Sequence, residues 1–397
     1  MSTYGENPYF EAPGSYFYQP TPPPLLPLHI ISYNMLTDDF LSYKEDDNEF
    51  IARRKRVMDQ ILHLVYICDI LLLQEVPTSF VATIYKGVGE LLDGNGNPMF
   101  VISHDVFMQY FGELGKDKEE KPVSLGLVTI SRNDMTVRNM TMSFLEQFFT
   151  EQNVKDAKDT VIRDNTKVRE YLVEQKRLSL RCVSTVSFGK STLASDMNFR
   201  CRDLLPRVQL LKFTSRDGYH FIIVNVHMTF GDDSRQANEM GEILKFRRDD
   251  RSKFGIAGLP VMFMGDFNII DPEKVLEYQL ESRLTKDKMG YLVGCEPTAQ
   301  EINEETGEIK HFHTDALFYT NDLIPDGNCL PIIDGYAFDP GYKRKSGILA
   351  NDTFTSDHVP VGIRIYVPKK VPVNVNLLNI GGGKKKKSKK IGRLEYF

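Results

Sequence analysis

The sequence lacks the features that mark secreted, membrane-spanning and zinc-binding proteins. Its 397 residues include only five cysteines, an odd number, and no two of them are spaced as C-x-x-C. A disulfide framework or a zinc knuckle is therefore not expected, and reduced thiols fit an intracellular protein. The chain has no apolar run of about 18 residues, so no membrane-spanning helix is predicted. No basic region followed by an apolar stretch opens the sequence, so we expect no secretory signal and a location in the cytoplasm or nucleus.

Positive charge is in the minority outside the C-terminal end. The chain has 49 basic and 54 acidic residues, a net charge of −5, and residues 384–397 hold seven of the basic and one of the acidic residues. This tail carries +6, which leaves −11 for the other 383 residues. General nucleic-acid-binding surfaces are basic over a whole face, and such a surface is not expected here. An acidic protein can still bind phosphate where a divalent cation supplies local positive charge.

Composition divides the chain into three parts. Residues 1–27 form a leader rich in proline and aromatic residues, which cannot form a helix and is expected to be extended or disordered. A flexible leader is one interpretation, and packing of its aromatic residues on the body or on a protein partner is the other. Residues 28–367 are expected to form one domain, with a charged insertion at about 134–200 that is a second candidate surface for a protein partner. Residues 368–397 are expected to be a flexible Lys-rich tail. A nuclear signal, an RNA contact and a solubilising role are all open for it.

Short apolar runs that end in polar residues dominate the central part. The runs are Leu28–Tyr33, Ile70–Leu73, Phe221–Val224, Val261–Met264 and Val359–Val367. They are rich in β-branched residues, which predicts buried strands. Between the first two, Phe50–Val65 shows the apolar spacing of a helix. A strand–helix–strand order predicts an α/β protein. Residues 301–311 are polar and Glu-rich, which predicts a loop.

Polar residues with catalytic or ligating side chains lie at or beside the ends of these runs. They are Asn34, Glu75, Asn225, His227, Asp266, Asn268, Asp357 and His358. Carboxylates that gather at one place repel and cannot all ionise without a cation. Carboxylate and amide oxygens are ligands for Mg²⁺ or Mn²⁺ rather than zinc. Two histidines suit proton transfer or the stabilisation of an oxyanion. The set predicts metal-assisted hydrolysis, with a phosphate ester as the natural substrate.

Each of these residues also has a structural interpretation. Glu75 could cap a strand, residues 266–268 could form an Asx turn, and residues 356–358 could form a polar turn before the last strand. One shared site explains the order of these motifs better than several unrelated turns do.

Taken together, the motifs resemble those of the endonuclease/exonuclease/phosphatase superfamily over roughly residues 28–367. The motifs are Tyr33–Leu36 (YNML), Leu73–Val76 (LQEV), Asn225–Met228 (NVHM), Gly265–Asn268 (GDFN) and Ser356–His358 (SDH). The resemblance implies a DNase I-like fold, which is a four-layer α/β sandwich of two packed mixed β-sheets flanked by helices.

Within the superfamily, the chain is most similar to the carbon-catabolite-repression deadenylase branch with its nocturnin-like and Angel-like relatives. Leu36 stands where abasic-site endonucleases usually have Asp, and Arg53–Met58 resembles the basic helix start of the branch. Residues 296–298 and His313–Tyr319 resemble another of its segments, although Ala316 replaces the usual tyrosine. The resemblance implies a Mg²⁺-dependent 3′-5′ exoribonuclease that acts on RNA or on another phosphodiester.

The resemblance also implies roles around the metal. Glu75 would be the principal ligand of Mg²⁺, with Mn²⁺ as an alternative, and Asn34 and Asp357 would assist it directly or through water. Asp266 would orient or deprotonate the attacking water.

Other residues would act on the phosphate. Asn225 and His227 would contact the scissile phosphate and stabilise the transition state, and Asn268 would hold the phosphate. Arg207 precedes a predicted strand at a place where the family often has a phosphate-contacting residue, and a surface arginine is the alternative.

The last predicted role is that of His358, which would also stabilise the transition state. Asp315 would fix its tautomer and orientation, because a carboxylate behind a histidine does so. Asp334 is the alternative partner. Whether His358 or Asp266 is the base stays open.

Three other functions remain. One is a phosphatase or phosphodiesterase on a nucleotide, an inositol phosphate or a sphingolipid. The inositol-phosphatase and sphingomyelinase relatives usually carry tryptophan-containing motifs, and this chain has no tryptophan. The second is a DNA endonuclease, which Leu36 disfavours. The third is a catalytically inactive interaction protein of the same fold, which the presence of Glu75, Asp266 and His358 disfavours.

Overall fold

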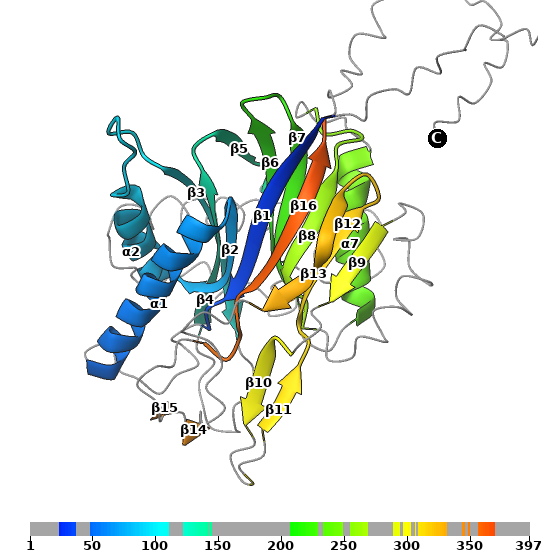
Figure 1. Cartoon of the computed structure of the whole chain (residues 1–397). Coiled ribbons are helices and arrows are strands. Elements are labelled where there is room, and N and C mark those ends of the chain that lie inside the picture. Colours follow the sequence, from blue (N-terminus) through cyan, green and yellow to red (C-terminus); the bar gives the residue numbers. More distant parts are fainter. Residues whose placement is uncertain are drawn as a thin grey trace, which may run out of the picture.

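Two six-stranded β-sheets pack face to face in this protein, with helices on the outer faces (Figure 1). The computed structural model describes residues 24–36, 48–110, 122–141, 143–144, 207–228, 233–248, 255–268, 289–293, 297–302, 306, 309–331, 344–345, 348–349 and 356–369. The predicted fold class, a four-layer α/β sandwich of two packed mixed β-sheets flanked by helices, is confirmed.

The first sheet has the strand order β13–β16–β1–β2–β4–β3. Its strands are Leu25–Asn34 (β1), Ile70–Pro77 (β2), Phe100–Tyr110 (β3), Pro122–Arg132 (β4), Ile324–Pro331 (β13) and Val361–Pro368 (β16). Strands β1 and β2 run parallel, and the other neighbours run antiparallel. Helix α1 (Asn48–Ile67) lies between β1 and β2 in the chain, and helix α2 (Thr78–Gly89) follows β2.

The second sheet has the order β5–β6–β7–β8–β12–β9. Its strands are Met135–Asn139 (β5), Val208–Ser215 (β6), His220–His227 (β7), Val261–Asp266 (β8), Met289–Val293 (β9) and Asp315–Thr320 (β12). Here β7 and β8 form the parallel pair, with helix α7 (Asp233–Arg248) between them in the chain. Each sheet therefore contains one parallel β-α-β unit.

The two β-α-β units bring polar residues to one rim of the sandwich. Parallel strands that are joined by a helix end at the same edge of their sheet. Asn34 and Glu75 lie at or near the ends of β1 and β2, and His227 and Asp266 end β7 and β8. Because β1 and β2 contact β7 and β8 across the sandwich, these four side chains lie at the same end of the molecule.

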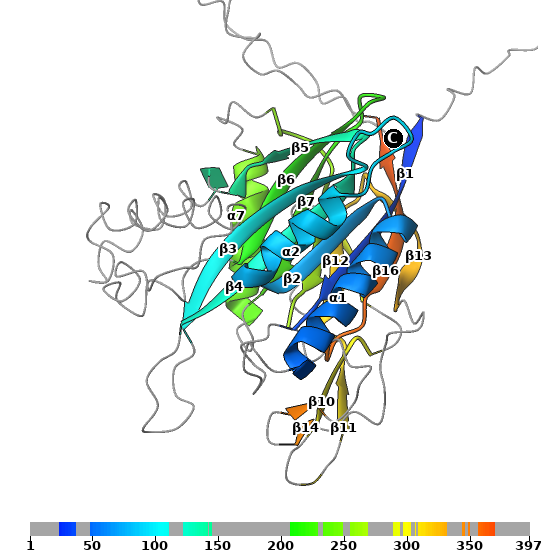
Figure 2. The same cartoon turned by 90° about the vertical axis from the view of Figure 1, so that its left-hand side faces the viewer.

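Apolar side chains fill three layers. Helices α1 and α2 cover the outer face of the first sheet, as Figure 2 shows, and α7 covers the outer face of the second. The layer between the sheets includes Ile30, Leu72, Ile223, Met264 and Ile363. Strand runs buried on both faces explain why the sequence shows continuous apolar runs rather than alternation.

The predicted strands and helix are present. The last strand, β16, begins at Val361 rather than at Val359, and the other elements are longer than predicted. Two further expectations differ from the structure. Residues 301–311 are not a single loop, because β10 (Ala299–Ile302) and β11 (Ile309–Phe312) form a hairpin there. The charged insertion starts later than residue 134, because Met135–Asn139 pairs with β6. Both segments are short and polar, so burial leaves little apolar pattern in them. The rest of the insertion, most of the leader and nearly all of the Lys-rich tail lie outside the described residues. The described residues also include a small hairpin of β14 (Arg344–Lys345) and β15 (Ile348–Leu349).

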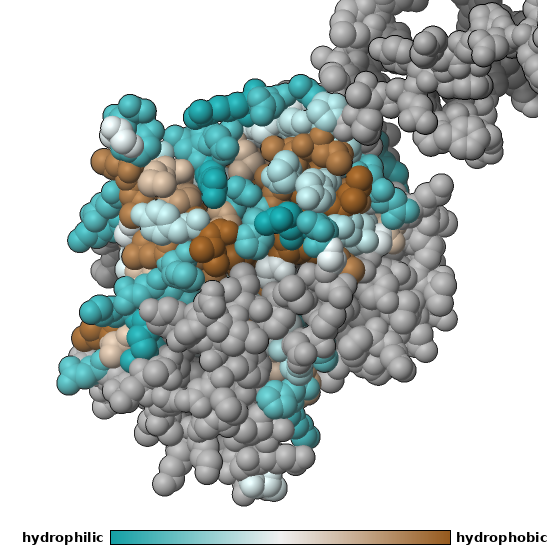
Figure 3. All heavy atoms as spheres, viewed as in Figure 1, coloured by the Kyte–Doolittle hydropathy of each residue, from teal (hydrophilic) through white to brown (hydrophobic). Residues whose placement is uncertain are grey.

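The visible surface is mixed in character. On the face in Figure 3, apolar residues lie in patches that hydrophilic residues interrupt. The large hydrophobic residues that are exposed in the described part of the chain are Leu25, Ile51, Tyr66, Ile67, Leu92 and Ile324. None of the helices in the described ranges combines the length and the hydropathy that crossing a membrane requires.

A buried carboxylate joins the two sheets at the side opposite β13. Asp105 on β3 accepts hydrogen bonds from Asn139 Nδ2 (2.8 Å) and Thr141 Oγ1 (3.1 Å) in the segment that contains β5. Burial raises the pKa of Asp105 to about 6, although these hydrogen bonds oppose the rise. The folded protein therefore holds the proton of Asp105 more tightly than the unfolded chain does.

Stability should consequently fall as the pH rises through this pKa. The contribution of Asp105 is fully present below about pH 4 and is lost by about pH 7, a change of about 3 kcal/mol. Asp105→Asn keeps the shape and removes the titration. We expect the difference in free energy of unfolding, wild type minus Asp105→Asn, to fall by about 3 kcal/mol between pH 4 and pH 8 in urea titrations. A difference that is constant with pH would contradict the prediction.

Candidate active site

Glu75 lies on a β-bulge near the end of β2. Leu73 pairs with Val128 and Val76 pairs with Gly126, so β2 has one more residue than β4 between these two pairs. Glu75 has a φ of +54°, a left-handed conformation that costs a residue with a side chain about 1–2 kcal/mol. Bulges redirect side chains and occur next to active sites. Here the bulge directs the Glu75 carboxylate toward His227 in the other sheet.

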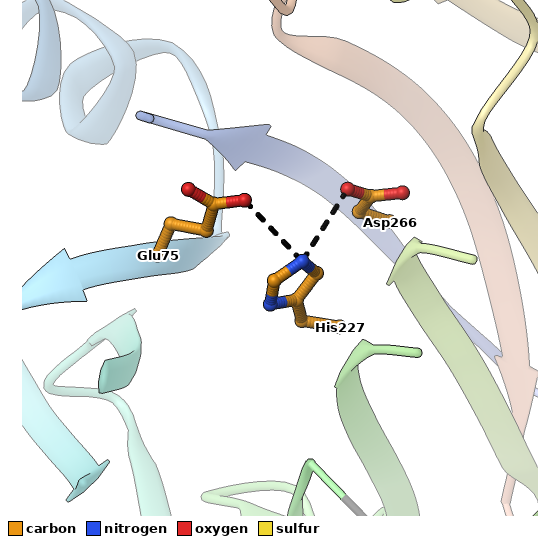
Figure 4. Close-up of side chains that lie close together, drawn as sticks. All are labelled: Glu75, His227 and Asp266. Atoms are coloured by element: carbon orange, nitrogen blue, oxygen red, sulfur yellow. Dashed lines mark ion pairs between the residues drawn. The ribbon is translucent and has the colours of Figure 1, made fainter. Parts of the chain in front are cut away.

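Glu75, His227 and Asp266 form a compact cluster between the two sheets. Nε2 of His227 is 3.3 Å from Oε1 of Glu75 and 3.8 Å from Oδ2 of Asp266, and Figure 4 shows the three side chains pointing toward one another. Their ligating atoms all lie within 4.8 Å of one another, and all three residues are buried. Gly265 has a φ of +149°, and a Cβ there would lie 2.1 Å from the carbonyl oxygen of Val226. Only glycine allows β8 to pass β7 this closely.

Asn34 links the two carboxylates. Its Nδ2 donates to Oε1 of Glu75 (3.1 Å) and to Oδ2 of Asp266 (3.0 Å). Its Oδ1 accepts the backbone N–H of Leu36 at 3.0 Å, which sets the orientation of the amide. The predicted role of Asn34 as a metal ligand would require the amide to turn and to give up the bond to Leu36.

A second histidine, His358, also lies close to Asp266. Nε2 of His358 is 3.8 Å from Oδ2 of Asp266, and its Nδ1 is 3.0 Å from Oδ2 of Asp315. Asp315 pairs with Asp266 in neighbouring strands, which explains why the carboxylate reaches behind His358. This is the geometry that the predicted orienting role of Asp315 requires. The alternative partner, Asp334, lies outside the described residues.

The two histidines differ in charge because their surroundings differ. For His227, burial and then the positive charges of Arg207 and His358 hold the pKa well below its usual value, so the imidazole is neutral. For His358, burial also disfavours the charge, but the carboxylates of Asp315 and Asp266 outweigh it and raise the pKa well above the usual value. Burial raises the pKa of Asp266 to about 7, although the charge of His358 lowers it. The surroundings therefore favour the neutral form of His227 and the charged form of His358.

Asn268 and Arg207 meet at the backbone of Met228. Nδ2 of Asn268 donates to Met228 O at 2.7 Å, and Nη2 of Arg207 donates to the same oxygen at 2.9 Å. The Asn268 N–H also donates to Oδ1 of Asp266 at 2.7 Å, so the Asx turn considered from the sequence is present and holds the Asp266 carboxylate. Both residues are half-buried and lie beside the cluster.

Asn225 does not share this location. Its side chain is fully buried, and its amide bonds to Gln74 and to the backbone carbonyls of Leu73 and Val128 in the first sheet. The predicted contact with a substrate phosphate would require these bonds to break.

The cluster suits a divalent cation. Two buried carboxylates repel each other, and a cation between them removes the repulsion. Carboxylate oxygens suit Mg²⁺, and the imidazole of His227 adds affinity for Mn²⁺ and other transition metals. Of the predicted ligands, Glu75 belongs to this cluster of carboxylate and imidazole groups, and Asn34 hydrogen bonds to both of its carboxylates. Asp357 is half-buried and its Oδ1 lies 3.5 Å from Ser356 Oγ.

Four supporting residues carry no role that the sequence predicts. Ser356 Oγ donates to Asn34 O (2.6 Å) and accepts the His358 N–H (3.1 Å), and Thr298 Oγ1 accepts the Asp315 N–H (3.2 Å). Gln74 bonds to Asn225. Arg53 is 1 % exposed and donates to the carbonyls of Met35 (2.6 Å) and Leu36 (2.7 Å). The sequence signal for these residues is that each lies within one of the motifs or segments that carry the family resemblance.

The bulge predicts an unusual order of stability at position 75. Glu75→Gly and Glu75→Ala both remove the carboxylate, but only glycine adopts φ of +54° without strain. After the backbone entropy of glycine is subtracted, we expect Glu75→Gly to be more stable than Glu75→Ala by about 1 kcal/mol in urea unfolding. The neighbouring pair Val76→Gly and Val76→Ala is the control and should show the ordinary order, with alanine more stable. The ordinary order at position 75 would show that the bulge is unstrained.

The chain matches no family model, and no curated protein matches it in sequence. Solved structures with a similar fold include ANGEL2, described as a 2′,3′-cyclic phosphatase in complex with adenosine-2′,3′-vanadate, at 12 % identity and a TM-score of 0.47, with 86 % of this chain and 96 % of that chain covered. The human Nocturnin catalytic domain with bound sulfate has 13 % identity and a TM-score of 0.42, with 85 % and 93 % covered. An endonuclease/exonuclease/phosphatase family protein from Bacteroides thetaiotaomicron has 14 % identity and a TM-score of 0.44, with 87 % and 99 % covered. The likeness is distant, and the roles of the residues rest on the geometry of the site itself.

Proposed function

We propose that this chain is a divalent-metal-dependent phosphoester hydrolase. The observation that carries the proposal is the buried cluster of Glu75, His227 and Asp266, beside which a second histidine, His358, lies with its Nε2 3.8 Å from Asp266 Oδ2. A sandwich held together by apolar packing gains nothing from burying two carboxylates and two imidazoles, because each costs solvation energy. Perturbed titratable groups that converge in this way are typical of catalytic sites.

Each side chain of the site has a separate role in the proposed hydrolysis. A divalent cation, with Glu75 as principal ligand, would supply positive charge to the substrate phosphate. Oδ2 of Asp266 lies 3.8 Å from Nε2 of each imidazole, where it can orient water and accept a proton from it. The His358 imidazolium donates to the phosphate oxygens as negative charge develops on them, and Asp315 keeps its Nδ1 proton in place. Asn268 and Arg207, at the edge of the cluster, complete the phosphate-binding side.

We further propose that the substrate is RNA and that the reaction is a 3′-5′ exoribonucleolytic, deadenylase-like cleavage with Mg²⁺ or Mn²⁺. The support is the set of five motifs in its order, the residue Leu36, and the segment His313–Tyr319. The segment lies at the site, because Asp315 belongs to it and contacts His358. The hairpin β10–β11 also borders the site, since Ala299 at the start of β10 forms an isolated antiparallel bridge with His358.

The test uses the purified full-length chain and 5′-labelled RNA that ends in a poly(A) tail. We expect stepwise shortening from the 3′ end that stops with EDTA and resumes with excess Mg²⁺ or Mn²⁺. A DNA of the same sequence and a small phosphomonoester serve as parallel substrates. Activity that survives EDTA would contradict the metal-dependent hydrolase. Metal-dependent hydrolysis of the DNA or the monoester alone would contradict only the exoribonuclease.

A further inference from the structure

Asn225 sits between the sheets, two residues before His227 on β7. It is 0 % exposed, and its amide makes three hydrogen bonds, all to the first sheet. Nδ2 donates to Leu73 O at 3.1 Å and to Val128 O at 3.4 Å. Oδ1 accepts from Nε2 of Gln74 at 2.7 Å. Leu73 and Val128 are the last pair of the β2–β4 ladder before the register shift.

These contacts surround the bulge that carries Glu75. A bulge leaves its extra residue unpaired and disrupts the ladder locally. The hydrogen bonds from Asn225 to the carbonyls of Leu73 and Val128 tie the last regular pair before the bulge to the facing sheet, which stabilises the irregular backbone. Gln74 hydrogen bonds to both Asn225 and Ser32, which holds the Asn225 amide with its NH₂ group toward the two carbonyls.

We propose that Asn225 is a positioning residue that holds the β-bulge of Glu75, and so the carboxylate that binds the cation, and does not contact the substrate phosphate. The inference rests on the proposed function, because it assumes that Glu75 binds a divalent cation. It replaces the phosphate-binding role that the motif resemblance implies for Asn225. It also gives a reason for Gln74 beside Glu75, since its amide sets the orientation of Asn225.

The test measures two affinities of the full chain by titration calorimetry: that for Mn²⁺ alone, and that for inorganic phosphate at saturating Mn²⁺. Asn225→Asp keeps the shape but presents oxygen to the two carbonyls. We expect its Mn²⁺ affinity to fall about 10–100-fold, as for residues that orient a metal ligand, and its phosphate affinity to change less than about twofold. Gln209→Ala is the control, because Gln209 is also 0 % exposed and accepts an inter-sheet hydrogen bond at 2.6 Å, but from Thr129 Oγ1 on β4 and not from a residue of β2. It should bind Mn²⁺ as the wild type does.

The alternatives give different results. If Asn225 contacts the phosphate, Asn225→Asp will lower the phosphate affinity and leave the Mn²⁺ affinity unchanged, which would overturn the inference. If Asn225 only supports the fold, Asn225→Asp will lower the free energy of unfolding and neither affinity, as is expected for Gln209→Ala. That result would also overturn the inference. If the wild type binds no Mn²⁺, the proposed function itself fails. Gln74→Met removes the bond to Oδ1 of Asn225 but leaves Asn225 in place, so it should weaken Mn²⁺ binding in the same direction, and it serves if Asn225→Asp does not fold.

Discussion

Asp266→Asn is expected to lower kcat for phosphoester hydrolysis by about a thousandfold or more while the chain stays folded. Oδ2 of Asp266 receives a hydrogen bond from Asn34 and faces Nε2 of both His227 and His358. An amide NH₂ at that position would meet the NH₂ of Asn34, and an amide oxygen would carry no charge and accept no proton. Since burial raises the pKa of Asp266 to about 7, the isosteric neutral side chain should not destabilise the fold. Steady-state kinetics and urea unfolding measure the two effects.

The matched control for this variant is Asp326→Asn. Asp326 lies on β13, its side chain is 52 % exposed, and its nearest charged partner is Arg364 at 4.0 Å. Such an exposed pair contributes little, so both activity and stability should match the wild type. If Asp266→Asn keeps a tenth of the wild-type kcat, Asp266 is not at the reacting centre.

Asp315→Asn is expected to lower kcat by about a hundredfold or more. Oδ2 of Asp315 lies 3.0 Å from Nδ1 of His358, and this carboxylate raises the pKa of the imidazole. An asparagine would keep the shape but lose the charge that holds the Nδ1 proton and favours the imidazolium. The fold should tolerate the change, because the main chain of Asp315 stays bonded to Thr298 and paired with β8.

A double variant shows whether Asp315 acts through His358. If it does, Asp315→Asn combined with His358→Asn should be no slower than His358→Asn alone, because residues that act as a unit do not have additive effects. Multiplied effects would instead assign Asp315 an independent role, such as a direct contact with substrate.

Much of the fold follows from local pattern. The five apolar runs become strands β1, β2, β7, β8 and β16, and the segment Phe50–Val65, which has helical spacing, becomes part of α1. These elements are buried on both faces or along a broad stripe, so burial selects apolar residues at nearly every position or at helical spacing. Strands β5, β10 and β11 carry no such pattern because they are short and partly exposed, and pairing rather than burial defines them.

The candidate site follows from the same pattern only in part. Asn34, Glu75, His227, Asp266 and His358 can be chosen from the sequence because each ends or follows an apolar run, and parallel strands carry such positions to one edge. The contacts that each side chain makes cannot be predicted from this pattern. Asn225 and His227 are two residues apart on one strand, and both side chains face the first sheet, as this spacing predicts. Their contacts still differ, because Asn225 bonds to the backbone carbonyl of Leu73 whereas His227 lies beside the Glu75 carboxylate.

The sequence by itself determined which residues are apolar enough to be strands, which polar residues end them, and therefore that carboxylates and histidines would meet at one rim. Local composition decides these matters, because burial and periodicity act over a few neighbouring residues. Only the tertiary structure decided that Glu75 leaves its ladder in a left-handed bulge, that the Asn34 amide bridges two carboxylates, and that Asp315 lies behind His358. Each of these depends on contacts between residues about 40 to more than 200 positions apart, and no local pattern encodes how two sheets come to face each other.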